Sequence, residues 1–298
     1  MHVVVAGSHG LIGSALIAHL TAAGHRVRRL VRGPTRSSRE ISWDPYGDVL
    51  DPADLQGVDA VVNLGGAGIG DHLWTPAYRK TILHSRTVPT ALLSRTLAAM
   101  DDGPAVLLQA SAVGFYGNRG SDPLTEASPP GSGFLADVVR AWEAATEPTD
   151  VHRVRTVHLR TGMLLAPDGG ALGRLLPLLR LGIGGPLGDG SNVWSWITLH
   201  DHVRAVEHLL TTPVVGPANL TAPAPVTQRE VIRAIAHGIN RPAAASVPAP
   251  LLRLVMRDMA DELLLSSQKA LPTVLEDSGF VWDHPGLEEA AGWLTRRA

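Results

Sequence analysis

Residues 3–13 read VVVAGSHGLIG and contain the strongest indication of the fold. The apolar run Val3–Ala6 is typical of a buried parallel strand, and 11–23 has the apolar spacing of a helix. The glycines between them are Gly7, Gly10 and Gly13. Glycines at this spacing permit a tight turn and a close approach of strand, helix and ligand backbone. The sequence therefore predicts a strand, a glycine turn and a helix in that order.

Alternating segments continue along the chain. Further strands are predicted at 27–31, 59–64, 105–110 and 154–159, and further helices at 77–100, 134–146, 201–210 and 228–238. Such alternation favours right-handed crossovers and a parallel sheet with helices on both faces. We therefore predict an α/β protein: a doubly wound parallel sheet of the Rossmann type with a smaller, α-rich C-terminal substrate region.

The domain organisation follows from a change of character after Arg160. We expect a nucleotide-binding domain at 1–165 with returning segments at about 191–225, and a substrate-side region at 166–190 and 226–298. Residues 169–190 are rich in glycine, and two interpretations of 182–190 stay open: a mobile lid or an irregular connection. The proline-rich stretch 243–250 is typical of a linker or an ordered crossing loop, and 251–297 is predicted to be mostly helical.

Composition excludes several classes of function. The chain has 298 residues, 45% of them hydrophobic, a net charge of -2 and no cysteine. This balance argues against a nucleic-acid surface and a polybasic membrane anchor, and it excludes disulfides and thiolate metal sites. The N-terminal apolar run is too short for a signal peptide or membrane span. We expect a cytoplasmic protein whose partner is a small-molecule substrate, with no nucleic acid and no membrane; its oligomeric state stays open.

No metal site is predicted from the thirteen histidines, because none has an HExxH-like spacing. The run His200-Asp201-His202 resembles a metal-binding fragment, but side chains of adjacent residues usually diverge. Asp201 is instead predicted to be a helix N-cap.

The glycine turn predicts a bound dinucleotide. Leu11 and Ile12 open the helix, whose free N–H groups and positive dipole end suit a pyrophosphate. Sites for NAD usually have an acidic residue at the end of the second strand, where this chain has Val31 and Arg32. A guanidinium suits the 2′-phosphate of NADP, so NADP is the predicted cofactor. The alternative is that Arg32 is one of several solvated arginines.

Ordered motifs along the whole chain resemble those of one superfamily. They are GSHGLIG at 7–13, Arg32, VVNLGG at 61–66, SAVGFYG at 111–117, LRTGMLLAPDGGALG at 159–173, GGPLGDG at 184–190, WSWITLHD at 194–201 and QKALPTVLEDSGF at 268–280. The chain resembles the extended, atypical short-chain dehydrogenases/reductases. More narrowly, it is similar to the NAD-dependent epimerase/dehydratase-like subfamily with a small C-terminal domain, sometimes labelled cell-division inhibitor.

The resemblance implies further cofactor contacts. Leu64 and Gly65 would lie beside the adenosine and ribose, and Arg86 would reach the phosphates. The remaining implied contacts are Ala110 and Ser111 at the nicotinamide ribose and Met163 and Leu164 at the nicotinamide. For each apolar residue the alternative is ordinary core, and for Arg86 it is a solvated side chain.

The resemblance also exposes a missing catalytic pair. Usual members have a Ser, a Tyr that transfers a proton, and a Lys four residues later that lowers the Tyr pKa. Ser111 matches the serine, but Phe134 and Val138 occupy the apparent Tyr and Lys positions. Tyr116 is the remaining acid or base candidate, although in relatives this position more often shapes the substrate pocket. The catalytic candidates are therefore Ser111 and Tyr116.

Two functions stay open. The first is an NADP-dependent oxidoreductase or epimerase-like enzyme acting on a small polar, sugar-like substrate. The second is a non-catalytic NADP(H) sensor or binding module, which the missing Tyr and Lys motivate. Trp194 and Trp196 would either form an aromatic wall over substrate or alternate across a short strand, one in and one out. A cell-division role has only the subfamily's label behind it.

Overall fold

The computed structural model describes residues 1–150, 154–167, 169–181, 184–243 and 246–296. Its central feature is a seven-stranded sheet with the strand order β11-β7-β5-β4-β1-β2-β3. The strands are β1 (His2–Ala6), β2 (Arg26–Arg32), β3 (Glu40–Trp43), β4 (Ala60–Asn63), β5 (Val106–Ala112), β7 (Arg155–Thr161) and β11 (Gly216–Leu220). Strand β1 pairs in parallel with β2 on one side and β4 on the other. The order of the strands thus reverses between β1 and β4, which is the switch point where such sheets bind ligands.

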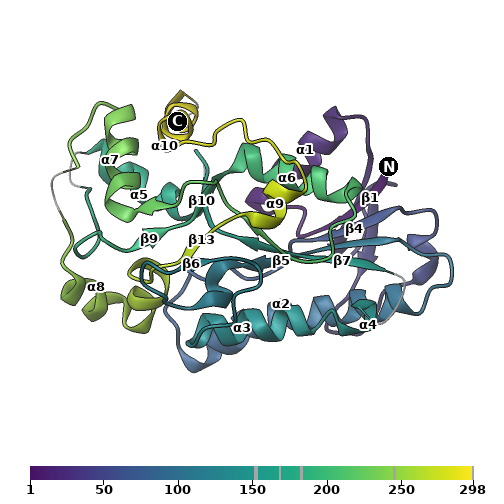
Figure 1. Ribbon diagram of the computed structural model, residues 1–298. Helices are drawn as coiled ribbons and strands as arrows, with labels where there is room; N and C mark the ends of the chain where they lie inside the picture. The colour runs from purple at the N-terminus through teal and green to yellow at the C-terminus, as the bar shows by residue number, and fades with distance from the viewer. Residues whose placement is uncertain (151–153, 168, 182–183, 244–245, 297–298) are drawn as a thin grey trace. The chain divides into compact units, whose positions relative to one another are not determined.

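Helices cover both faces of this sheet. They are α1 (Leu11–Ala22), α2 (Pro76–Ala98), α3 (Phe134–Ala144), α4 (Glu147–Asp150) and α6 (Leu199–Thr211), with a 3-10 turn at Pro52–Leu55. In Figure 1, α1 and α6 lie above the strands, whereas α2 and α4 lie below them. His19 on α1 accordingly bonds Glu207 on α6 at 2.6 Å, and the Ser94 hydroxyl on α2 donates to the Thr146 carbonyl at 3.0 Å. The predicted α/β, doubly wound Rossmann-type fold is confirmed.

The chain divides into two compact units. Unit 1 comprises 1–111, 138–159 and 203–217, and unit 2 comprises 112–137, 160–202 and 218–298. The chain passes from one unit to the other within β5, α3, β7, α6 and β11. This division differs from the predicted one, which placed 112–137 with the nucleotide-binding domain.

The core of unit 1 lies between the sheet and its helices. Val3, Val4 and Val5 are fully buried, because helices cover both faces of a parallel sheet and leave no strand face to water. Val4 packs in one cluster with Leu93 of α2 and Leu107 of β5. Complete burial of one such side chain contributes about 1.5–3 kcal/mol. The apolar run that opened the sequence is therefore also the centre of this core.

Unit 2 contains small sheets and short helices. Its strand pairs are β8 (Met163–Leu165) with β10 (Trp196–Thr198), β9 (Val193–Trp194) with β12 (Val226–Thr227), and β6 (Pro123–Leu124) with β13 (Lys269–Ala270). Its helices are α5 (Gly170–Arg180), α7 (Gln228–Gly238), α8 (Ala249–Met256), α9 (Thr273–Asp277) and α10 (Leu287–Arg296), with a 3-10 turn at Val113–Tyr116 and a π-helical turn at Ala260–Leu264. A thirteen-residue buried cluster that includes Ile235 and Trp293 forms its core.

Several local predictions were wrong. The glycine-rich segment contains α5, and β3 was missed because four residues give too little alternation to detect. Trp194 and Trp196 form neither a wall nor an alternating pair: both are buried in the same apolar cluster. Parts of the predicted lid (182–183) and linker (244–245) lie outside the described residues.

Asp201 is not the N-cap of its helix. Helix α6 begins at Leu199, and the Thr198 hydroxyl accepts the hydrogen bond from the Asp201 N–H at 3.0 Å. Thr198 therefore performs the capping role that was assigned to Asp201, and the Asp201 carboxylate is used elsewhere.

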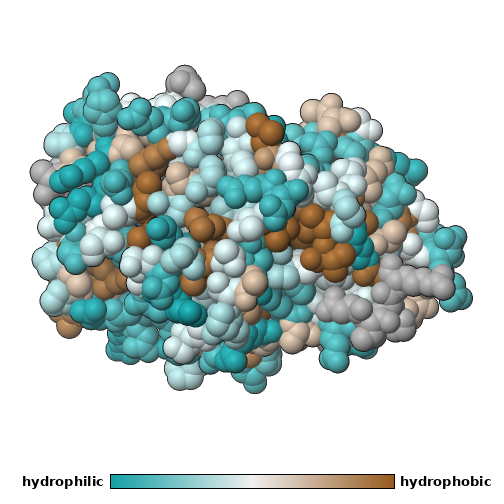
Figure 2. Space-filling view, in the orientation of Figure 1, coloured by the Kyte–Doolittle hydropathy of each residue, from teal (hydrophilic) through white to brown (hydrophobic). Residues whose placement is uncertain are grey.

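None of the described helices has the length and apolarity needed to cross a membrane. Figure 2 shows one face of the molecule, on which hydrophilic residues predominate and hydrophobic ones gather in several separate groups.

Candidate functional site

The turn after β1 accepts only glycine at its ends. Gly7 has φ +74°, and a Cβ there would lie 2.6 Å from the Leu64 carbonyl carbon. A Cβ at Gly13 would overlap the Gly7 carbonyl oxygen. The first glycine thus brings β1 against the end of β4, and the third brings α1 against the turn. Gly10 closes the turn by donating its N–H to the Gly7 carbonyl at 3.0 Å.

Helix α1 begins at this turn with an open N-terminus. Within the described chain, no side chain caps the helix at Gly10, and its first turn contains no acidic residue. Leu11 and Ile12 are the first residues of the helix, and Leu11 is only partly buried. The first N–H groups of a helix have no carbonyl partner within it, so this end suits an anion.

Strand β2 places Arg32 at the same edge of the sheet. Ala6 of β1 lies opposite Leu30 of β2, so Val31 and Arg32 extend beyond the end of β1 on the side where Gly7 begins the turn. The Arg32 side chain is exposed and forms no hydrogen bond or ion pair within the described residues. Glu40, the nearest acid downstream, accepts the Arg36 N–H at 2.6 Å.

Strand β4 places Leu64 and Gly65 on the other side of the turn. The Leu64 N–H donates to the Ala6 carbonyl at 3.1 Å, and the Gly65 N–H donates to the Asn63 side-chain oxygen at 3.3 Å. Asn63 is buried and also donates to Thr90 and Gln109, at 3.1 and 2.9 Å. This buried polar network holds the loop after β4, because an unpaired polar group there would cost about 1–3 kcal/mol.

Arg86 on α2 is a largely buried cation beside this loop. A Cβ at Gly66 would lie 3.2 Å from its guanidinium carbon, and the guanidinium lies 5.1 Å from the ring centre of Trp142. It donates to the Ile82 carbonyl at 3.0 Å but forms no ion pair within the described chain. Burial lowers the pKa of Arg86 to about 10. Burying a charged group without a partner is energetically costly, so an anion bound beside Arg86 would be strongly stabilising.

Ser111 on β5 has a partner in unit 1. It is buried, and its hydroxyl donates to Glu143 Oε1 at 2.6 Å. Glu143 lies nine residues after Phe134 in α3, which is about 13 Å along a helix axis. The hydroxyl of Ser111 is thus directed to a carboxylate far along α3 from the apparent Tyr position. Ala110, also predicted to contact cofactor, is partly buried on the same strand.

Tyr116 belongs to unit 2 and is fully buried. Its hydroxyl donates to Asn219 Oδ1 at 2.8 Å and accepts from the Arg160 guanidinium at 3.1 Å. Burial is the largest effect on this phenol and raises its pKa, although Arg160 and Asn219 oppose the rise. A buried phenol with a raised pKa and two hydrogen-bond partners is suited to packing and less to proton transfer.

The beginning of α3 has a carboxylate instead of a tyrosine. Glu262 of the π-helical turn accepts the Phe134 and Leu135 N–H groups at 3.0 and 2.7 Å. Val138, at the apparent Lys position, is buried. A negative charge here is stabilised by two N–H groups and by the helix dipole.

Met163 and Leu164 lie on β8 of unit 2 and are partly buried. They pair with Trp196 and Ile197 of β10. In unit 1, by contrast, one region holds most of the predicted cofactor contacts. Around the ends of β1, β2 and β4 lie the glycine turn, Val31, Arg32, Leu64, Gly65 and Arg86. Sequence reasoning missed Asn63, Thr90, Trp142 and Glu143; the available signal was a polar residue inside the apolar strand Ala60–Asn63.

Comparison with known proteins shows the family to which the chain belongs. Residues 3–221 match the NAD dependent epimerase/dehydratase family, and residues 247–294 match a domain of unknown function, DUF1731. The epimerase family protein Mb2239 of Mycobacterium bovis is 44% identical over 296 residues, which is 99% of this chain and 98% of that protein.

Two solved structures are also similar. The crystal structure of the human epimerase family protein SDR39U1 with NADPH has a TM-score of 0.92 and 30% identity, and the match covers 100% of both chains. A nucleoside-diphosphate sugar epimerase from Corynebacterium glutamicum has a TM-score of 0.81 and 33% identity, over 99% of this chain and 58% of that one. The chain therefore belongs to the NAD dependent epimerase/dehydratase family and ends in a DUF1731 domain.

Proposed function

We propose that this protein binds NADPH at the carboxyl edge of β1, β2 and β4. The observation that carries the proposal is the open N-terminus of α1 behind a turn that excludes side chains at Gly7 and Gly13. The pyrophosphate would lie at this helix end, as anions do at helix N-termini. The solved relative SDR39U1, which is similar over its whole length, was crystallised with NADPH.

The preference for NADPH over NADH rests on Arg32. A 2′-phosphate at the end of β2 would meet an exposed guanidinium without a competing carboxylate, since Glu40 bonds the backbone of its own loop. Arg86 supplies a second cation beside the loop after β4. Neither the end of β2, at Arg32, nor the position of Arg86 offers the carboxylate that would accept a hydrogen bond from a ribose 2′-hydroxyl.

With NADPH bound, the function best supported is that of an oxidoreductase or epimerase-like enzyme. Nicotinamide would supply hydride chemistry, and this chain would bind and orient a small polar substrate. A sugar-like substrate is supported by the similarity to a protein described as a nucleoside-diphosphate sugar epimerase.

A non-catalytic NADPH sensor is the second candidate, and specific contacts favour it. The polar groups that are candidates for proton transfer already have partners, since Ser111 bonds Glu143 and Tyr116 bonds Asn219. At the apparent Tyr position, the first N–H groups of α3 bond Glu262. A sensor would change shape or exchange partners when NADPH binds, without oxidising it.

Two measurements test these proposals. Fluorescence titration of the purified protein should show tighter binding of NADPH than of NADH; equal affinities would contradict the role of Arg32. Incubation with NADPH and a panel of carbonyl compounds and nucleotide sugars should then oxidise the cofactor. Binding without turnover across the panel favours the sensor, whereas hydride transfer eliminates it.

A further inference from the structure

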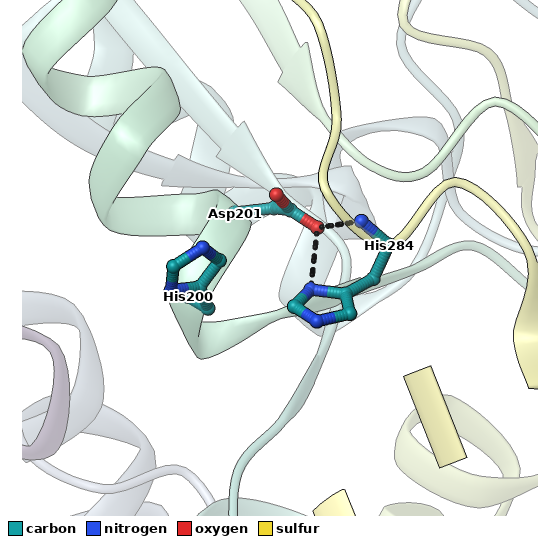
Figure 3. A group of neighbouring side chains, drawn as sticks. All are labelled: His200, Asp201 and His284. Carbon is teal, nitrogen blue, oxygen red and sulfur yellow. Dashed lines mark hydrogen bonds and ion pairs between the residues drawn. The ribbon is translucent and has the colours of Figure 1, made fainter. Parts of the chain in front are cut away.

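Unit 2 contains a histidine–carboxylate cluster that the cofactor site does not use. His200 and Asp201 lie in the first turn of α6, and His284 lies in the segment between α9 and α10. One potential ligand atom from each of the three lies within 4.8 Å of the other two. Figure 3 shows the His284 ring directed at the Asp201 carboxylate, with His200 beside them. Residues 83 positions apart in the chain are thus brought together by folding.

The spacing of His284 and Asp201 fits a bound metal ion. His284 Nδ1 lies 3.2 Å from Asp201 Oδ2, and the Asp201 side chain is completely buried. Two ligands of a tetrahedral zinc ion, each about 2.0–2.1 Å from the metal, are about 3.3 Å apart. An ion could therefore lie between these two atoms with little movement of either side chain, once the His284 proton has moved from Nδ1 to Nε2 of the same ring.

His200 completes a three-ligand set. Its Nε2 lies 2.6 Å from Asp283 Oδ2, so when Nε2 donates to this carboxylate, Nδ1 keeps its lone pair. A carboxylate behind a ligating histidine is the usual arrangement in metal sites, where it fixes the tautomer and orients the ring. The His200 side chain is 35% exposed, which leaves room for its ring to rotate and for water to reach a fourth position.

We propose that His200, Asp201 and His284 bind a divalent transition metal, for which Zn²⁺ is the best match. Two imidazoles and one carboxylate suit zinc, whereas Mg²⁺ and Ca²⁺ prefer oxygen ligands. Asp283 is the positioning residue for His200. The ion would join the first turn of α6 to the segment that leads into α10.

The surroundings of the cluster favour rigid ligands. The Asp201 carboxylate also accepts the Asp283 and His284 backbone N–H groups, at 2.8 and 3.0 Å, and the Thr198 hydroxyl at 3.1 Å. Trp293 of α10 packs against both imidazoles, with ring centres 5.5 Å from His284 and 6.4 Å from His200. His202 follows His200 and Asp201 in the sequence, but it bonds Thr161 and does not belong to the ligand set.

Zinc titration of the full-length, EDTA-treated protein tests the site. Calorimetry at pH 7.5 should show one Zn²⁺ per chain and no comparable binding of Mg²⁺. His284→Asn and His200→Asn should each weaken binding at least tenfold, and Asp283→Asn should weaken it about tenfold.

A second histidine–carboxylate cluster supplies the matched control. His19 and His25 in unit 1 both contact Glu207, at 2.6 and 3.2 Å. His19→Asn should leave zinc affinity unchanged. Loss of binding in His19→Asn, or unaltered binding in His284→Asn, would overturn the assignment.

A measurement on the protein without substitutions tests metal binding even if the variants fail to fold. Co²⁺ in place of Zn²⁺ should produce visible absorption bands with the intensity of a tetrahedral site and should quench Trp293 fluorescence, so that less quenching is seen in Trp293→Phe. The absence of these bands at stoichiometric Co²⁺ would show that the cluster is held by hydrogen bonds alone.

Discussion

Arg32 ends β2 with a guanidinium that no described residue engages. If it binds the 2′-phosphate, Arg32→Ala should weaken NADPH binding by about ten- to a hundredfold, because charged hydrogen bonds contribute about 1.5–3 kcal/mol. NADH binding should change little. Titration of both cofactors measures this, with Arg26→Ala as control, since Arg26 is exposed at the opposite end of the same strand. An equal loss of affinity for NADPH and NADH would instead indicate that the substitution disturbs strand β2.

The burial of Arg86 should favour NADPH binding more than it favours the stability of the fold. Arg86→Met keeps much of the packing on Trp142 but removes a desolvated charge, so the free energy of unfolding without cofactor should be unchanged or higher by up to about 1 kcal/mol. NADPH affinity should fall at least tenfold. Urea unfolding and cofactor titration measure the two effects, and Arg95→Met, exposed on the same helix, should alter neither by a comparable amount. A marked loss of stability in Arg86→Met would show that the cation serves the fold.

At the scale of elements, helix α3 depends on a carboxylate supplied from far along the chain. Glu262→Ala removes the acceptor of two N–H groups and should cost about 1–2 kcal/mol of unfolding free energy. Glu262→Gln keeps an acceptor but loses the charge at the helix N-terminus, so its cost should be intermediate. Urea unfolding gives the energies, and hydrogen exchange at Phe134 and Leu135 shows whether the effect is local. Identical costs for both variants would contradict a contribution from charge.

At the scale of the whole molecule, acid sensitivity should depend on one buried imidazole. His202 is completely buried, and desolvation lowers its pKa from 6.5 to about 4. The unfolded chain therefore binds a proton more tightly than the folded protein, and stability should fall as the pH drops from 6.5 towards 4. The difference amounts to at most about 3 kcal/mol.

Urea unfolding at pH 7.5 and pH 5, in buffer with EDTA, measures this dependence. His202→Gln should lose less stability between the two pH values than the parent protein, whereas His237→Gln, at an exposed position of α7, should lose as much. An unaltered pH dependence in His202→Gln would assign the effect to other groups.

The first half of the fold could be predicted from the sequence because its signals are local. An apolar run, three glycines and a periodic helix fix β1, the turn and α1, and Arg32 follows from its place at the end of the next strand. Residues whose roles depend on distant partners could not be predicted. Nothing near Glu262 points to the start of α3, and nothing near Asp201 shows that His284 takes its carboxylate. Trp194 and Trp196 lie on two separate short strands, and both side chains pack into one core. The prediction that they alternate across one strand placed one of them inside and the other outside.

The division of the chain has a consequence for how the protein is made. Neither unit is a continuous stretch of sequence, since unit 1 is complete only at residue 217 and unit 2 begins at residue 112. On the ribosome, β11 must leave the exit tunnel before the large sheet can acquire its last strand, so nearly three-quarters of translation precedes the completion of the first unit. Dividing the gene at any single point between residues 112 and 217 would therefore leave neither unit complete on one fragment.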